Sequence, residues 1–178
     1  MRVIVADIET TGLFLKDGHK IIEFCGLEMI DDKLTGKKFH SYFNPMRDIP
    51  DEAFNIHGIS NEFVKYKPLF KDKVDELLEF IRKDNLVFHN AEFDIKFINN
   101  ELTLLGLENI TMDRVIDTLE LARIHYPNNG LKLDNLCIML DVKDRERIIH
   151  GAEKDALLLS DVYLKLMEKT VELMKTEM

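Results

Sequence analysis

Short apolar runs dominate the first part of the chain. Three of them, at 2–8, 21–30 and 38–43, predict strands because they are brief and rich in β-branched and aromatic residues. The polar segment 31–36 separates the second run from the third, so these two runs are expected to pair antiparallel in a meander with the first. The run at 2–8 ends in the turn sequence Glu9-Thr10-Thr11-Gly12.

After residue 50 the apolar residues follow a helical period. A short helix is expected from Pro50 to His57, and longer helices at 68–81, 93–105, 119–125, 132–140 and 152–174. Two brief apolar runs, at 86–88 and 115–116, predict buried strands between these helices. This order predicts a single α/β domain over residues 1–178, with a mixed five-stranded sheet flanked by helices.

Composition is that of an ordinary globular protein, with 46% apolar and 32% charged residues. No stretch approaches the ~18 consecutive apolar residues of a membrane helix, and the run before Asp7 is too short for a signal peptide. We therefore expect no membrane partner and a cytoplasmic location. Cys25 and Cys137 lie in apolar surroundings far apart in sequence and are expected to be reduced core residues.

The net charge of −9 argues at first against a nucleic-acid partner, because proteins that bind phosphates normally carry basic surface. An acidic enzyme can still act on nucleic acid if its carboxylates hold divalent cations, which then supply the positive charge. Such an enzyme would bind DNA weakly by itself and would gain from being carried by a partner. Charge alone therefore leaves this question open.

Asp7 and Glu9 lie two positions apart in the first predicted strand, so their carboxylates share one face. Adjacent carboxylates repel each other unless a cation lies between them, and Mg²⁺ or Mn²⁺ prefers such oxygen ligands. A solvated strand end is the alternative explanation for an isolated pair of acids. The Thr10-Thr11-Gly12 sequence that follows favours a ligand site, since Gly12 permits close approach of the backbone.

The segment His89–Asp94 follows the predicted strand 86–88 directly. It is therefore expected at a strand-to-helix junction, where open α/β sheets bind ligands. Helix-start chemistry accounts for two of its polar residues, with Asn90 as a cap and Glu92 in the first turn. Asp94 lies about one turn into the helix among apolar neighbours, which makes it a candidate site residue.

His150 and Asp155 are separated by about 140° if both lie on one helix. They can share a site more easily if Asp155 lies on the helix and His150 on the loop before it, and Gly151 fits a break between them. A loop histidine beside a metal site is well placed to take a proton from water. By itself His150 would be an ordinary surface residue.

In order and spacing, these residues resemble the catalytic set of the DEDDh exonuclease family: Asp7, Glu9, Asp94, His150 and Asp155. The neighbouring sequences are similar to those of the epsilon, or proofreading, subunits of bacterial DNA polymerase III. The similarity extends from about residue 3 to residue 166, and four segments carry it: Asp7–Gly12, Glu52–Ile59, His89–Asp94 and Leu133–Cys137.

The resemblance implies a ribonuclease H-like fold, two divalent metal ions (Mg²⁺ or Mn²⁺), and release of nucleoside monophosphates from a single-stranded or frayed DNA 3′ end. It implies His150 as general base, Glu52 as a ligand of the terminal 3′-hydroxyl and His57 as a contact of the terminal nucleotide. It also implies that four acids are metal-binding and catalytic: Asp7, Glu9, Asp94 and Asp155. Three of them, Asp7, Glu9 and Asp155, would contact the substrate as well.

Two features depart from the epsilon pattern. Glu153 and Lys154 replace residues that are usually apolar in these subunits. The subunits also continue into a flexible tail that binds the polymerase, whereas this sequence stops at Met178, so the tail is expected to be absent. Association with the catalytic subunit of DNA polymerase III is therefore expected of a full-length protein.

Two alternative functions are compatible with the pattern. A DEDDh enzyme could degrade RNA ends or short oligoribonucleotides, and the sequence does not show whether the site accepts a 2′-hydroxyl. A non-catalytic binding module on the same fold is disfavoured, because all the acids and the histidine are present.

Overall fold

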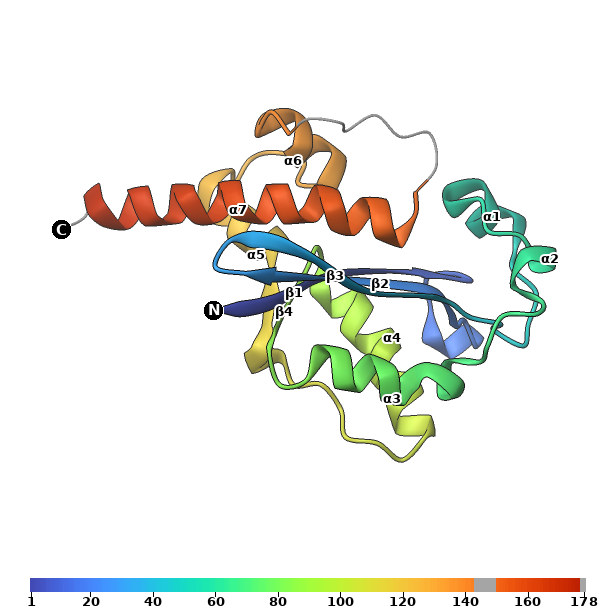
Figure 1. Ribbon diagram of the computed structural model, residues 1–178. Coiled ribbons are helices and arrows are strands. Elements are labelled where there is room, and N and C mark those ends of the chain that lie inside the picture. The colour runs from blue at the N-terminus through green and yellow to red at the C-terminus, as the bar shows by residue number, and fades with distance from the viewer. Residues whose placement is uncertain (143–149, 177–178) are drawn as a thin grey trace.

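The computed structural model describes residues 1–142 and 150–176 (Figure 1). Its strands are β1 (Arg2–Thr10), β2 (Ile21–Ile30), β3 (Lys33–Tyr42), β4 (Asn85–Phe88) and β5 (Val115–Asp117). Its α-helices are α1 (Asp51–His57), α2 (Asn61–Val64), α3 (Phe70–Ile81), α4 (Ala91–Leu104), α5 (Thr118–His125), α6 (Leu133–Met139) and α7 (Ala152–Thr176). Two 3₁₀ turns, η1 (Leu15–Asp17) and η2 (Met112–Arg114), complete the elements, and neither these nor α2 was predicted from the sequence.

The five strands form one mixed sheet in the order β3-β2-β1-β4-β5. β1, β2 and β3 pair antiparallel as a meander, while β4 pairs parallel with β1 and β5 pairs parallel with β4. The meander and the mixed sheet predicted from the sequence are therefore confirmed. The carboxyl ends of β1, β4 and β5 meet along one edge of the sheet, which is where open α/β sheets place their ligands.

The turn between β2 and β3 is tighter than the sequence predicted. Only Asp31 and Asp32 lie outside the strands, with φ values of 48° and 63°, and β3 already begins at Lys33. Aspartate tolerates the left-handed conformation that a two-residue hairpin turn requires at both central positions. The prediction that 31–36 separates the strands was wrong for this reason.

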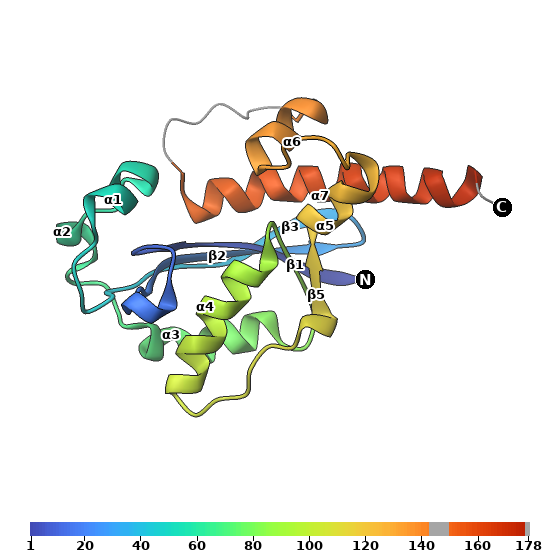
Figure 2. The same ribbon diagram turned by 180° about the vertical axis from the view of Figure 1, so that it is seen from behind.

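Helices cover both faces of the sheet (Figures 1 and 2). α3 and α4 pack on one face around a core that includes Ile4, Leu77 and Phe97. α7 covers the other face, with α5 and α6 packed against it, around a core that includes Val5, Leu136 and Val162. α1 and α2 lie at the end of the sheet near the start of α7, so that segments distant in sequence meet there.

Cys25 and Cys137 are both buried and free, as the sequence predicted. Desolvation raises the pKa of the Cys25 thiol to about 12, and the nearby carboxylates of Glu153 and Glu23 add to this effect. Cys25 is therefore an inert core residue. In the part of the chain that the structure describes, no helix has the length and apolar character needed to cross a membrane.

Candidate active site

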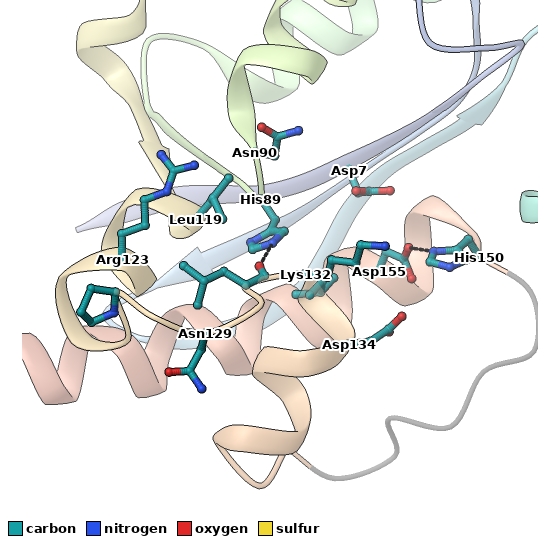
Figure 3. Close-up of a pocket in the computed structure, with 13 residues that line it drawn as sticks. Asp7, His89, Asn90, Leu119, Arg123, Asn129, Lys132, Asp134, His150 and Asp155 are labelled. Atoms are coloured by element: carbon teal, nitrogen blue, oxygen red, sulfur yellow. Dashed lines mark hydrogen bonds and ion pairs between the residues drawn. The ribbon is translucent and has the colours of Figure 1, made fainter.

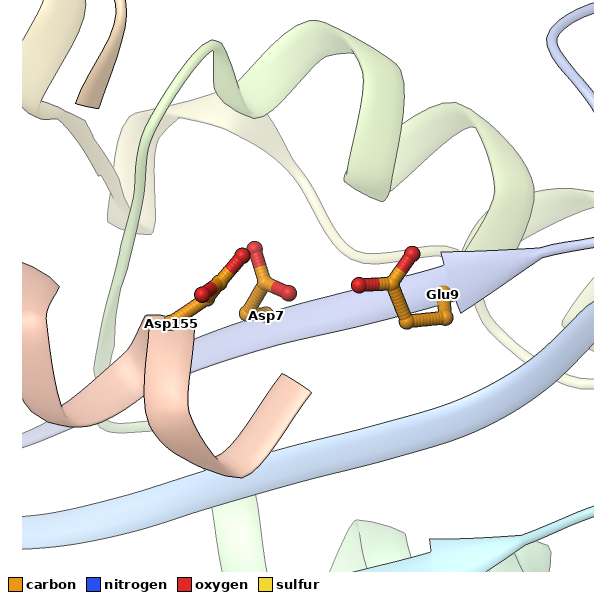
Figure 4. A group of neighbouring side chains, drawn as sticks. All are labelled: Asp7, Glu9 and Asp155. Carbon is orange, nitrogen blue, oxygen red and sulfur yellow. The ribbon is translucent and has the colours of Figure 1, made fainter. Parts of the chain in front are cut away.

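Three carboxylates converge where β1 passes the start of α7. One oxygen from each of Asp7, Glu9 and Asp155 lies within 4.8 Å of the other two. Figure 4 shows Asp155 reaching from the first turns of α7 toward Asp7, with Glu9 next along the strand. The pairing of β1 with β2 shifts register between Glu9 and Thr10, a bulge of the kind that often lies beside active sites.

Asp94 lies close to this cluster but is buried at 4% exposure in the first turn of α4. Burial raises the pKa of its carboxyl well above the usual range, and the charge of Asp117 acts in the same direction. A hydrogen bond with the backbone of Ile8, between Asp7 and Glu9, partly offsets this rise. Asp94, the remaining acid of the predicted set, is thus hydrogen-bonded to β1, the strand that carries Asp7 and Glu9.

His150 contacts Asp155 directly, with its Nδ1 3.1 Å from Oδ2. As the sequence suggested, His150 precedes α7 while Asp155 lies in the helix's first turn. The amide of His150 also donates to the carbonyl of Ile56 in α1, at 3.0 Å. The histidine therefore connects the end of α7 that carries Asp155 to the helix that carries Glu52 and His57.

Buried polar contacts fix the start of α7 against the sheet. The Glu23 carboxylate, only 2% exposed, accepts a hydrogen bond from the Ala152 amide at 3.1 Å and contacts His40 Nε2 at 2.7 Å. Glu153 pairs with Lys38 and with His40 on β3, and Lys38 lowers the pKa of its carboxyl. The unusual acid at 153 therefore anchors the helix to the edge strand. Sequence analysis missed Glu23, whose signal is an acid inside an apolar strand.

A cavity of about 430 Å³ opens beside Glu9. Its walls are mostly apolar and combine the β1 turn, the start of α4 and the helix α1, with Phe14, Ile56 and Phe93 among the lining residues. Glu52 and His57, which the sequence resemblance linked to substrate, line the same cavity. An apolar cavity with a few polar groups beside a carboxylate cluster has the character of a small-molecule site.

His57 is buried, and desolvation lowers its pKa, an effect that Glu23 and the Thr10 carbonyl partly offset. Its Nδ1 accepts a hydrogen bond from the Ile59 amide at 3.0 Å, so the neutral ring carries its proton on Nε2. Among the described residues this buried Nε2 has no hydrogen-bond partner of good geometry. A buried donor in a cavity wall is stabilised when a ligand supplies the acceptor.

Gly12, also in this cavity wall, makes room for a histidine that sequence analysis missed. A Cβ at Gly12 would lie 2.6 Å from the Nδ1 of His19, which is within 3.0 Å of the Thr11 hydroxyl. The glycine was expected to let backbone approach a ligand, but its near neighbour is this imidazole. The sequence pattern did not identify His19 as a site residue, because its position depends on the loop between β1 and β2.

A larger cavity, of about 860 Å³, lies on the other side of the acids (Figure 3). Asp7, Asp155 and His150 line one end, and the segment between α5 and α6 forms the opposite wall. His89 lines it too, with Nδ1 2.9 Å from the Thr118 hydroxyl and Nε2 2.8 Å from the Leu131 carbonyl. The carboxylate cluster thus lies between a small, mostly apolar cavity and a larger one whose lining combines polar and apolar side chains.

Asn90 occupies the N-cap position of α4, but its side chain makes no capping hydrogen bond. Instead the carboxylate of Asp117 accepts bonds from the amides of Asn90 and Ala91, at 2.9 and 3.0 Å, and caps α5 through the Leu119 amide. The expectation that the Asn90 side chain caps the helix was therefore wrong. The carboxylate of Asp117, at the end of the next strand, takes this role, because it accepts hydrogen bonds from two amides at once.

The donor set suits hard divalent cations, because three carboxylates meet within 4.8 Å and a fourth is buried beside their strand. Carboxylates gathered this closely repel one another, and a cation between them removes that repulsion. The residues present therefore fit the metal ions that exonucleases of the DEDDh type use.

Comparisons with known proteins agree with this geometry. The exonuclease family model RNase_T matches residues 4–163. The DNA polymerase III subunit epsilon of Rickettsia conorii is 49% identical over 170 residues, covering 94% of this chain and 74% of its own. The epsilon subunits of Salmonella typhimurium and Escherichia coli K12 are 44% and 41% identical, each covering 93% of this chain and 71% of its own.

Solved structures share the fold. The nuclease domain of 3′hExo, a DEDDh family member bound to rAMP, matches with a TM-score of 0.80 at 18% identity and covers 94% of this chain and 92% of its own. Exonuclease X in complex with 5′ overhanging duplex DNA matches with a TM-score of 0.71 at 22% identity, covering 94% and 91%. The chain therefore belongs to the exonuclease family, among the DNA polymerase III epsilon subunits, and is a 3′–5′ proofreading exonuclease.

Proposed function

We propose that this exonuclease hydrolyses DNA 3′ ends with two divalent cations, Mg²⁺ or Mn²⁺, bound by Asp7, Glu9, Asp94 and Asp155. The observation that carries the proposal is the convergence of three carboxylates within 4.8 Å between two cavities. When bound, the two cations would activate the attacking water and stabilise the charge on the leaving 3′-oxygen. Asp94 would complete this set from its buried position in the first turn of α4, next to the backbone of Ile8.

His150 is the general base in this proposal. Its Nδ1–H donates to the Asp155 carboxylate, which leaves Nε2 as the basic nitrogen of the neutral ring. His150 takes a proton from the water as the water oxygen bonds to phosphorus and the P–O3′ bond breaks. The leaving 3′-oxygen takes a proton from solvent and ends as a hydroxyl on the shortened strand, and the product is a nucleoside 5′-monophosphate.

The terminal nucleotide binds in the smaller cavity. Glu52 accepts a hydrogen bond from the 3′-hydroxyl, and the buried Nε2–H of His57 donates to the nucleotide. Phe14 and Phe93 offer apolar and aromatic surface to the base or sugar. Asp7, Glu9 and Asp155 would hold the cations that bind the scissile phosphate.

The names of the relatives support a partner as well as an activity. The relatives are subunits of DNA polymerase III, so we propose that the protein acts beside the catalytic subunit of that polymerase. The rival substrate is RNA, and the fold alone allows it because one structural neighbour is bound to rAMP. The epsilon relatives favour DNA.

A labelled single-stranded DNA tests the proposal. With Mg²⁺ or Mn²⁺ we expect a ladder of products that shortens one nucleotide at a time from the 3′ end, and no digestion after chelation by EDTA. A matched RNA strand should be cut more slowly. Activity that persists in EDTA would rule out the metal mechanism, and faster cutting of RNA would favour the exoribonuclease alternative.

A further inference from the structure

The DNA strand upstream of the scissile bond needs a binding surface, and the carboxylates of the candidate site do not supply one. In the proposed function the terminal nucleotide fills the smaller cavity, so the nucleotide before it must lie on the other side of the metal ligands. That side is the 860 Å³ cavity, which Asp7 and Asp155 border. A chain with a net charge of −9 needs a local cation there to hold a phosphate.

Lys132 is placed to be that cation. It lines the larger cavity at the residue before α6, and Figure 3 shows its side chain extended from the loop toward Asp155 and Asp7. Within the described part of the chain its ammonium makes no ion pair. By contrast Arg123, the other cation of the cavity, is paired with Glu120 on its own helix.

Two side chains fix the backbone next to Lys132. His89 Nε2 donates to the Leu131 carbonyl at 2.8 Å, and Asn135 Nδ2 donates to the Gly130 carbonyl at 3.1 Å. Packing is close at the second contact, since a Cβ at Gly130 would lie 2.9 Å from Asn135 Nδ2. The lysine therefore extends from a fixed point of the cavity wall, which lowers the entropy lost when it binds a phosphate.

We propose that Lys132 binds the phosphate immediately 5′ of the scissile phosphate, and that His89 and Asn135 are positioning residues for it. This inference rests on the proposed function, because it takes the terminal nucleotide to lie in the smaller cavity. Lys132 binds the strand through charge, so it contributes affinity for any sequence. Lys132 therefore affects the binding of oligonucleotides. A substrate with a single phosphodiester has no upstream phosphate for Lys132 to bind.

Two substrates distinguish binding of the upstream phosphate from hydrolysis of the scissile phosphodiester. The first is single-stranded oligothymidylate, and the second is the p-nitrophenyl ester of thymidine 5′-monophosphate, which contains only the scissile phosphodiester. For Lys132→Ala we expect KM for the oligonucleotide to rise roughly tenfold at low salt, with kcat little changed. The slope of log(kcat/KM) against log[salt] should fall in magnitude by about 0.7, the value for one lost phosphate contact. Hydrolysis of the ester should be unchanged.

Matched variants control for charge and for fold. Lys83→Ala removes an exposed lysine just before β4, at the opposite end of that strand from His89, and should leave both substrates unaffected. Lys132→Arg should retain the salt slope of the parent. Asn135→Ala should raise KM for the oligonucleotide by less than Lys132→Ala does, without changing ester hydrolysis.

Failure of this inference can be told from failure of the proposed function. If the parent enzyme hydrolyses neither substrate, the metal site has been misassigned. If the parent hydrolyses both and Lys132→Ala keeps the parent's KM and salt slope, the phosphate contact does not exist. An equal loss on both substrates would place Lys132 on the scissile phosphate and overturn the assignment to the upstream phosphate.

Discussion

His150 and Asp155 are in contact although they lie on different elements, with Nδ1 of the histidine 3.1 Å from Oδ2 of the aspartate. The aspartate is 5% exposed on α7, whereas the histidine lies partly exposed on the loop before it. A buried carboxylate and a partly exposed imidazole are thereby held side by side. This relationship allows their proposed roles, as metal ligand and proton acceptor, to be separated by mutation.

Changing His150 to Ala should slow the exonuclease without abolishing metal binding. The substitution leaves Asp7, Glu9 and Asp155 in place and removes the proposed proton acceptor together with its hydrogen bond to Asp155. General-base catalysis typically contributes about 10²–10⁴-fold. Single-turnover digestion of labelled DNA measures the rate, and the thermal shift caused by Mn²⁺ measures metal binding. As a control, His125→Ala removes an imidazole that contacts Thr170, far along α7, and should retain the parental rate. Full activity in His150→Ala would remove His150 from the mechanism.

Changing Asp7 to Asn should instead remove metal binding. Cations that bind only the native state raise its melting temperature, so the parent should melt higher in Mn²⁺ than in EDTA. The variant should lose most of this difference and all detectable exonuclease activity. In EDTA it should melt no lower than the parent, because one of three mutually repelling carboxylates is neutral. Differential scanning calorimetry with and without Mn²⁺ measures both effects.

Asp113→Asn is the matched control, since this exposed acid lies in η2, before β5 and outside the carboxylate cluster. It should keep the parental thermal shift. A thermal shift of the same size in Asp7→Asn and in the parent would show that the cations bind elsewhere.

A phosphate on the 3′ end should block digestion if Glu52 contacts the terminal hydroxyl. Opposing a phosphate to a carboxylate costs several kcal/mol, which corresponds to a rate lower by about a hundredfold or more. Glu52→Gln removes this charge but keeps a hydrogen-bonding group, so it should narrow the difference between free and phosphorylated ends. Initial rates on strands with a free and with a phosphorylated 3′ end measure this difference. Equal rates on both ends in the parent would exclude the assigned role of Glu52.

The fold and much of the candidate site could be predicted because local patterns encode them. Strand periodicity alone places Asp7 and Glu9 on one face, and the break at Gly151 separates His150 from the helix that carries Asp155. The structure brings Asp7, Glu9 and Asp155 together, with His150 against the last of them. Their catalytic roles remain predictions.

The unpredicted features depend on contacts between distant segments. Glu23 matters because α7 returns across β2 and presents the Ala152 amide to it, and no local pattern announces that contact. Lys132 lines the larger cavity from a loop whose preceding carbonyl, at Leu131, is bound by the distant His89. The β2–β3 turn was misjudged for a different reason, since Asp31 and Asp32 can adopt positive φ without glycine.

Base pairing at the 3′ end should slow the enzyme. A site that takes one terminal nucleotide into a cavity must unpair it first, at a cost of a few kcal/mol on a matched duplex. Single strands should therefore be digested fastest, mismatched ends more slowly, and blunt matched duplexes slowest. Initial rates on three substrates that share one labelled strand measure this order. Equal rates on matched duplex and single strand would contradict the proofreading function.

Gly12 and His19 share a wall of the smaller cavity. An alanine Cβ at Gly12 would lie 2.6 Å from His19 Nδ1, so the imidazole must move and give up its contact with the Thr11 hydroxyl. We expect Gly12→Ala to weaken inhibition by thymidine 5′-monophosphate roughly tenfold, while the thermal shift caused by Mn²⁺ is kept.

A double-mutant cycle identifies the cause of this loss. Once His19 has been changed to Ala, the space beside Gly12 is open, and the added methyl group should have little further effect. His19→Ala and Gly12→Ala/His19→Ala should therefore bind the monophosphate equally well, as measured by their inhibition constants. If the double variant is as much weaker than His19→Ala as Gly12→Ala is weaker than the parent, the two effects are independent. In that case the glycine is required by the ligand or the backbone, as the sequence first suggested, because His19 would not explain the loss.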